Sequence, residues 1–279
     1  MISLAPFDRS REPRIRAEAQ AMAESFRDAL LESCAPGSID GVYVKGSAYR
    51  PWDSAIDYVP GVSDVDIHVR ISPAAPHPRR SIDLALAVGE RARVLFRARN
   101  PRPVHVPRAQ LIFLDEIESM PGYLPSPVGS VRTLHGTPYL GAEAEMYRDT
   151  APEDRLRFDV DRDFVLVDLP GKVVDRPGLA LWNVIERLTW RVGPTGPRVL
   201  TQLGADPFVV WATHRTAIVN ELVDRGCEAV AEAYIGYYEA GWKGFESSFQ
   251  APEPARDAIE AATRLFVAAQ EVVERSQER

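Results

Sequence analysis

Hydrophobic and polar residues recur along the chain with two different periods. Near the N-terminus, apolar residues return every three or four positions, which predicts an amphipathic helix over residues 15–30. Two short runs then alternate apolar and polar side chains and predict strands at Val42–Lys45 and Asp64–Ile71. A further helix is predicted over residues 85–96 and a further strand over residues 111–114. This order of helices and strands is typical of a mixed α/β unit.

From about residue 175 onward, every periodic pattern is helical. Apolar residues recur there along one side of each predicted helix, as expected for helices that pack together. Gly236, Gly241 and Gly244 weaken the prediction for one of these helices, because glycine is a poor helix former. The predicted helices cover residues 181–192, 208–222, 228–249 and 259–273.

These patterns divide the chain into two predicted domains. Its 279 residues are enough for two domains of ordinary size. We expect an α/β (α+β) core with a mixed sheet over residues 1–172, followed by an all-helical bundle over residues 173–279. At the end of the core, Phe164–Leu169 predicts one more strand, which is reached through a charged turn at Asp159–Asp163.

Composition and charge narrow the classes of function. The chain is 45% hydrophobic and 26% charged, as in an ordinary soluble protein. No apolar run approaches the roughly 18 residues that a membrane span needs, and the first residues lack the pattern of a signal peptide. We therefore expect a cytoplasmic protein without a membrane partner. The net charge of -7 argues against a broad electrostatic grip on nucleic acid and favours a small substrate.

The most informative residues lie just after the first predicted strand and on the second. Asp64 and Asp66 project from one face of a strand about 7 Å apart, because side chains alternate and each residue rises about 3.3 Å. Two carboxylates on a solvent-facing wall can share the divalent cations that nucleotidyl transfer requires. Gly46 permits close approach of the backbone to an anion, and Ser47 offers a hydroxyl and an amide to phosphate oxygens. The pattern thus combines a candidate phosphate site with a candidate metal site.

This pattern resembles the signature of the DNA polymerase beta-like nucleotidyltransferase superfamily, in which an apolar residue and Gly-Ser are followed, after a spacer, by Asp-x-Asp on the next strand. The matching residues are Val44, Gly46, Ser47, Ser63, Asp64 and Asp66. The resemblance implies transfer of a nucleoside monophosphate from a nucleoside triphosphate to a hydroxyl of a small acceptor, with release of pyrophosphate. It also implies two Mg²⁺ ions on Asp64 and Asp66. Lys45, beside the Gly-Ser pair, is either a phosphate ligand or a solvent-facing strand residue.

Within this superfamily, two further features resemble those of the antibiotic (aminoglycoside) nucleotidyltransferases. The predicted helical half is similar to the all-helical C-terminal domain of those enzymes. The segment TLHGTPYLG at Thr133–Gly141 looks like the Leu-x-Gly turn that many bacterial members carry after the core sheet.

Three features depart from the superfamily pattern. The spacer between Ser47 and Asp64 is 16 residues long and contains prolines, so only a short helix at about Trp52–Tyr58 fits there. At the position expected for a third carboxylate on a later strand the chain carries Gln110, and an amide cannot act as a base. His68 shares the face of the two aspartates, where it either contacts the acceptor or is solvated.

These departures leave other functions open. The missing third carboxylate favours, as an alternative, a noncatalytic nucleotide-binding or regulatory protein that keeps the fold. A toxin-like nucleotidyltransferase acting on tRNA or protein is a third candidate, which the acidic net charge disfavours.

In the helical half, Arg215 on an apolar stripe either extends over the core, pairs with a buried carboxylate, or contacts phosphate. Tyr234, Tyr237 and Tyr238 are expected to pack between helices, with an acceptor pocket as the alternative.

Overall fold

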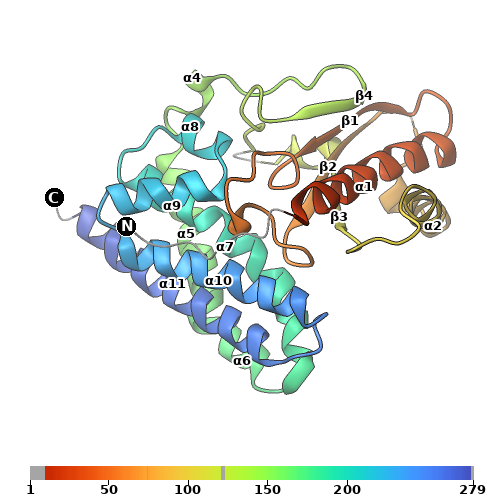
Figure 1. Cartoon of the computed structure of the whole chain (residues 1–279). Coiled ribbons are helices and arrows are strands. Elements are labelled where there is room, and N and C mark those ends of the chain that lie inside the picture. Colours follow the sequence, from red (N-terminus) through yellow and green to blue (C-terminus); the bar gives the residue numbers. More distant parts are fainter. Residues whose placement is uncertain (1–9, 74, 121–122, 278–279) are drawn as a thin grey trace. The chain divides into compact units, whose positions relative to one another are not determined.

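The structure is a computed structural model that describes residues 10–73, 75–120 and 123–277 (Figure 1). Its described residues form two compact units. The sheet unit comprises residues 10–50 and 63–142, and the helical unit comprises Pro51–Val62 together with residues 143–277. This division differs from the boundary after residue 172 that the sequence predicts, because residues 143–172 and the Pro51–Val62 segment belong with the helices.

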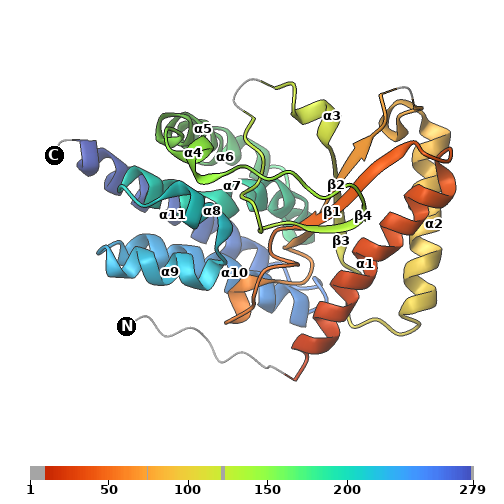
Figure 2. The ribbon, with the colours of Figure 1, turned by 90° about the horizontal axis from the view of Figure 1, so that it is seen from above.

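The sheet unit is built on a mixed sheet of four strands in the order β3-β2-β1-β4 (Figure 2). β1 runs antiparallel to both β2 and β4, and β3 runs parallel to β2. The mixed sheet and the three predicted strands are confirmed, and β4 adds an edge strand within the segment that resembles the Leu-x-Gly turn. The strands are β1 (Ile39–Lys45), β2 (Asp64–Ile71), β3 (Arg108–Phe113) and β4 (Arg132–Gly136).

One face of this sheet is apolar and lies against a helix. Val42 and Val44 of β1 stand beside Val69 and Ile67 of β2, and all four are buried. α1 contacts β1, β2 and β4, and α2 packs beside α1 (Figure 2). Alternation therefore places the polar residues of the same strands on the opposite face. The helices of this unit are α1 (Glu12–Ser33), α2 (Ile82–Arg99), the short α3 (Leu114–Ile117) and a 3₁₀ turn at Pro78–Arg80.

A buried carboxylate on α1 fixes the chain that leads into β3. Glu18 is 2% exposed. Its carboxylate accepts hydrogen bonds from the backbone N–H groups of Val104 at 2.6 Å and His105 at 3.0 Å, and it lies 2.7 Å from Nδ1 of His105. A buried carboxylate needs such partners to offset its lost hydration. This contact holds the segment from which Arg108 and Gln110 enter the sheet.

The helical unit confirms that the chain after residue 175 is helical, and three of the four predicted helices correspond to α7, α10 and α11. α10 and α11 lie side by side and share a core with α7 (Figure 1). Tyr234, Tyr237 and Tyr238 are buried in this core, as the packing interpretation predicts. Its helices are α4 (Ala144–Tyr147), α5 (Ala151–Asp163), α6 (Leu169–Val173), α7 (Trp182–Gln202), α8 (Pro207–Ala212), α9 (Arg215–Asp224), α10 (Glu228–Glu246) and α11 (Glu253–Gln277), with a 3₁₀ turn at Gly178–Leu181.

The strand predicted at Phe164–Leu169, and the charged turn before it, are wrong. Residues 151–163 form α5, and a π-helical turn at Phe164–Asp168 leads directly into α6. Phe158, Val165 and Leu169 are buried in the helical core at helical spacing. A short apolar run does not by itself distinguish a buried strand from one face of a helix. The charged residues before it form ion pairs along α5, such as Arg155 with Asp159.

Pro51–Val62 is anchored in the helical unit by the carboxylate of Asp57, which is 2% exposed. One oxygen accepts hydrogen bonds from the N–H groups of Asp53 at 2.8 Å and Ser54 at 3.0 Å and from the hydroxyl of Thr216 at 2.7 Å. The other accepts the backbone N–H of Thr216 at 2.8 Å, in the first turn of α9. Because the first N–H groups of a helix lack partners within the helix, Asp57 completes the start of α9.

This anchoring explains two differences from the predicted elements. The stripe predicted over residues 208–222 is broken into α8 and α9, because Thr213 and His214 are extended just before the residue that Asp57 binds. The short helix expected at Trp52–Tyr58 is reduced to a 3₁₀ turn at Ala55–Asp57.

Arg215 and Gly241 also serve this anchoring. Arg215 donates to the carbonyl oxygens of Ile56 at 2.9 Å and Asp57 at 3.1 Å, and its guanidinium lies 4.0 Å from the ring centroid of Tyr238. Binding to backbone carbonyls is not among the roles that the sequence suggests for it. A Cβ atom at Gly241 would lie 2.8 Å and 2.9 Å from methyl carbons of Val62 and Val59. The glycine in α10 therefore makes room for the segment.

None of the helices among the described residues is long and apolar enough to cross a lipid bilayer.

We predict that Asp57→Asn lowers the free energy of unfolding of the helical unit by about 2 kcal/mol or more. An amide replaces one acceptor oxygen by a donor that faces N–H groups, and hydrogen bonds to buried charged groups are the strong ones. The measurement is urea unfolding followed by circular dichroism. The matched control is Asp53→Asn, whose largely exposed carboxylate pairs with His214 and is expected to contribute less than about 1 kcal/mol. Equal losses in both variants would contradict the assigned role of Asp57.

Candidate functional site

The polar face of the sheet brings the two parts of the predicted site together. The β1–β2 register places Lys45 beside Asp66. The parallel register of β2 and β3 places Arg108 beside Asp64 and Gln110 beside Asp66. Because paired residues on neighbouring strands project from the same face, these side chains form one polar surface across three strands.

The turn after β1 closes over Asp66. Gly46 has a φ of +74°, and an added Cβ atom would lie 2.0 Å from Oδ2 of Asp66. The N–H groups of Tyr49 and Arg50 both donate to the carbonyl oxygen of Gly46 at 3.1 Å, which makes residues 46–50 a single turn. Only glycine satisfies both the positive φ and this close approach. Gly46 and the carboxylate of Asp66 therefore lie against each other on the polar face, with Ser47 next in the turn.

Asp64 differs from the expected picture of a solvent-facing metal ligand. It is 8% exposed, and Oδ1 forms an ion pair with Nε of Arg108. Ser63, just before it, is also buried. Breaking such a pair leaves a buried charge uncompensated, so the partly buried Arg108 holds Asp64 in place. The prediction that both aspartates face solvent is thus wrong for Asp64.

The third strand presents an arginine and an amide where the superfamily pattern calls for a carboxylate. Gln110 lies at the predicted position, beside Asp66. Arg108 is a site residue that the sequence reasoning misses, although it has the same strand parity as Gln110 and precedes it by two positions. Within the described part of the chain, no group of three or more His, Cys, Asp or Glu side chains is arranged to hold a metal ion.

His68 is buried rather than solvated, which corrects one of the two predicted roles. Its side chain lies beside Tyr43 on the polar face and is 2% exposed, and neither ring nitrogen hydrogen-bonds to another described residue. Burial, with a smaller contribution from the charge of Lys45, lowers the pKa of His68 to about 2. The imidazole is therefore neutral at physiological pH and is a poor proton acceptor.

Lys45 is half-buried and binds a neighbouring loop. Its Nζ donates to the hydroxyl of Ser126 at 3.0 Å. Burial lowers the pKa of Lys45, and the nearby charge of Asp66 opposes that shift. The amino group of Lys45 thus lies on the same polar face as the two aspartates.

Ser126 and Tyr139, from the segments before and after β4, contact residues of the polar face. The ring of Tyr139 lies 5.2 Å from that of Tyr43 and 6.4 Å from that of His68, measured between centroids. Its hydroxyl accepts the backbone N–H of Ser126 at 3.1 Å. The segment that resembles the Leu-x-Gly turn thus contributes an aromatic cover above His68.

No family model, no curated protein and no solved structure matches this chain. The resemblance to the nucleotidyltransferases therefore stays a prediction that depends on the residues of the polar face.

We predict that His68 makes the stability of the protein pH-dependent. The unfolded chain binds a proton at this residue below its ordinary pKa of about 6.5, and the folded chain does not, so stability falls as the pH falls. From pH 8 to pH 5 this loss amounts to about 2 kcal/mol. His68→Leu and His68→Gln both remove the titrating group. Between pH 8 and pH 5, each variant should therefore lose about 2 kcal/mol less stability than the wild type loses. Urea unfolding at the two pH values measures it. Variants that follow the wild-type pH dependence would show that folding does not lower the pKa of His68.

Proposed function

We propose that this protein binds a nucleoside triphosphate at the Gly46–Ser47 turn and transfers its nucleoside monophosphate to a hydroxyl of a small acceptor in the cytoplasm. The observation that carries the proposal is the contact between Gly46 and the carboxylate of Asp66. A backbone turn able to approach phosphate and a carboxylate able to hold a cation lie at one point of the sheet. Nucleotidyl transfer needs this combination, because its catalysis is mainly positioning and charge neutralisation.

The charges of the polar face favour one Mg²⁺ ion over the two that the resemblance implies. Two carboxylates, Asp64 and Asp66, stand among the cations Lys45 and Arg108, and Asp64 is paired with Arg108. Mg²⁺ is commonly held by one or two carboxylates together with substrate phosphates. Asp66 fits that role, and Gln110 beside it offers a carbonyl oxygen. A bound Mg²⁺ would supply neutralisation of phosphate charge.

The remaining residues then have separable roles. The Gly46–Ser47 turn orients the triphosphate, and Lys45 and Arg108 supply positive charge to phosphate oxygens. The acceptor oxygen forms a bond to the α-phosphorus while the bond to pyrophosphate breaks, and the hydroxyl proton is released to solvent water. Neither Gln110 nor the neutral His68 is suited to accept the hydroxyl proton. His68 is better suited to a neutral hydrogen bond with a bound polar group, since its ring nitrogens bond no other described residue.

We predict that Asp66→Asn abolishes Mg²⁺-dependent stabilisation by nucleoside triphosphates and any transfer. The wild type should be stabilised by about 2.7 kcal/mol when the nucleotide is at 100 times its dissociation constant. Thermal unfolding with each of the four nucleoside triphosphates and Mg²⁺ measures binding. Incubation with radiolabelled nucleotide and either pooled aminoglycosides or total RNA, at two salt concentrations, measures transfer. The matched control is Asp83→Asn, an exposed carboxylate of α2, which should behave as the wild type.

Each outcome of this experiment has a distinct meaning. Label in the aminoglycosides supports the proposal. Label in RNA alone, with a steep salt dependence, would favour the toxin-like alternative. Nucleotide binding without label in either pool would favour a noncatalytic protein, and an Asp66→Asn variant with wild-type transfer would place the reaction elsewhere.

A noncatalytic nucleotide-binding or regulatory protein is the second candidate, and the pairing of Asp64 with Arg108 favours it. An arginine on one aspartate and an amide beside the other remove negative charge that bound metal needs.

For this candidate we predict that Gln110→Glu tightens Mg²⁺ binding about tenfold or more, because an added carboxylate neutralises charge that an amide only solvates. Titration calorimetry with Mg²⁺ alone measures it, and Gln250→Glu, at an exposed position of the helical unit, is the control. Tighter Mg²⁺ binding with new transfer activity identifies a site that has lost catalysis. Unchanged Mg²⁺ affinity would show that Gln110 lies outside the metal site.

A further inference from the structure

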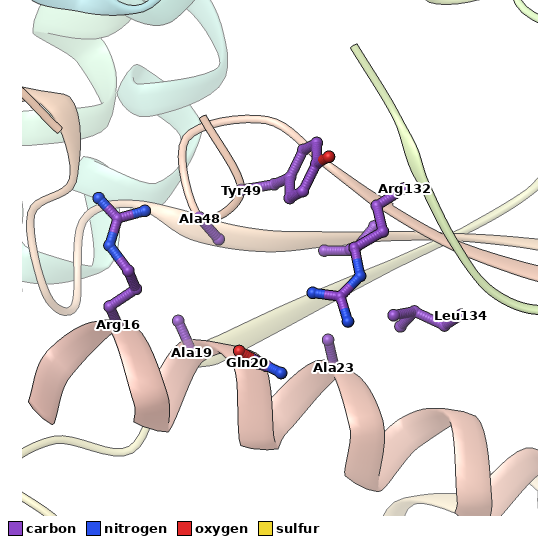
Figure 3. A pocket seen from close by; sticks show the side chains of 9 residues that line it. Arg16, Ala19, Gln20, Ala23, Ala48, Tyr49, Arg132 and Leu134 are labelled. Carbon is purple, nitrogen blue, oxygen red and sulfur yellow. The ribbon is translucent and has the colours of Figure 1, made fainter. Parts of the chain in front are cut away.

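A concave site lies in the sheet unit, on the face opposite to Asp64 and Asp66. It is a pocket of about 220 Å³ lined by α1, by the end of β1 with the turn that follows, and by the edge strand β4 (Figure 3). Val44 of β1 lies in its wall, and the alternation of the strand separates this residue from Lys45 on the polar face. The pocket is therefore distinct from the proposed nucleotide site.

The pocket is cationic although the chain as a whole is acidic. Arg16 rises from α1 toward the turn after β1, and Arg132 reaches from β4 toward α1, with the amide of Gln20 between them (Figure 3). None of the lining residues is acidic. Arg16 is held in position, because it donates to the carbonyl oxygen of Arg50 at 3.2 Å and to Glu12 at 3.3 Å. Two guanidinium groups from separate elements thus share one concave surface.

The remaining walls of the pocket are small and apolar. Ala19 and Ala23 of α1 and Leu134 of β4 form part of the lining, and Tyr49 adds an aromatic ring with a hydroxyl. Such walls accommodate a hydrocarbon body beside the charged groups. The volume lies below the roughly 300 to 1,000 Å³ of pockets for drug-sized ligands, so the occupant is small.

From these features we propose that the pocket binds a small phosphate monoester. A guanidinium presents a fork of donors that matches phosphate oxygens. Arg132 and Arg16 together oppose the charge of about -1.5 to -2 that a phosphate monoester carries at pH 7, and Arg16 shares its charge with Glu12. The apolar walls contact the organic group. The Nε2 of Gln20 donates to Glu24 at 2.8 Å and has a second N–H for the phosphate. The proposal does not rest on the function proposed for the polar face.

A ligand in the pocket would also contact the turn over residues 46–50, on the side of the sheet opposite to the polar face. Ala48 and Tyr49 line the pocket and belong to the turn that the N–H groups of Tyr49 and Arg50 close onto Gly46. A phosphate monoester bound there contacts this turn on the side away from Asp66.

The test is titration calorimetry of the full-length protein with phenyl phosphate, in EDTA to exclude metal-dependent binding at the polar face. Arg132→Gln and Arg16→Gln are each expected to raise the dissociation constant about tenfold or more, because each removes charge-assisted hydrogen bonds. The matched control is Arg97→Gln, an exposed arginine of α2, which should bind as the wild type. Thermal unfolding in chloride confirms that each variant is folded.

Lys45→Gln, which removes a cation of the polar face, separates the two candidate phosphate sites. Unchanged binding of phenyl phosphate by Lys45→Gln, together with weakened binding by the arginine variants, supports the pocket. The proposal is overturned if the wild type does not bind phenyl phosphate, if both arginine variants bind it with wild-type affinity, or if Lys45→Gln loses binding. Tighter binding of benzoate than of phenyl phosphate would assign the pocket to carboxylates instead.

Discussion

The arrangement of the polar face depends on the absence of a side chain at Gly46. Any other residue there would place a Cβ atom 2.0 Å from Oδ2 of Asp66 and would have to adopt a φ of +74°. An L-residue with a side chain adopts that conformation only at a cost in free energy. The antiparallel pairing of Lys45 with Asp66 brings the turn to this carboxylate. The close approach and the register therefore support each other.

The two faces of the sheet separate two kinds of charge. On the polar face, carboxylates and cations alternate within a few residues, and Arg108 neutralises Asp64. On the other face, Arg16 and Arg132 border a pocket whose lining contains no acidic residue. The turn over residues 46–50 is common to both, since it contacts Asp66 through Gly46 and lines the pocket through Ala48 and Tyr49. The two faces of a single sheet thus present surfaces of different chemistry.

Local periodicity was enough to predict β1, β2 and β3 and the shared face of Asp64 and Asp66, because alternation along a strand follows from backbone geometry. It did not predict β4. It could not predict that Arg108 pairs with Asp64, since the register of a parallel neighbour depends on contacts distant in sequence. The same limit applies to α9, whose first turn is bound by Asp57 from another part of the chain. At Phe164–Leu169, the apolar run was compatible with the period of a strand and with that of a helix. The segment is helical because Val165 and Leu169 pack into the core of the helical unit.

Pro51–Val62 leaves the sheet unit to join the helical unit, and this limits where the chain can be cut into independent fragments. The described chain passes between the units at residues 50/51, 62/63 and 142/143, so a cut after residue 142 does not release the sheet unit cleanly. Such a fragment would still carry Ile56, Val59 and Val62, which belong to the core of the helices, and would expose them to water. Gene fusions and truncations that treat the first 142 residues as an independent module should therefore yield aggregation-prone products.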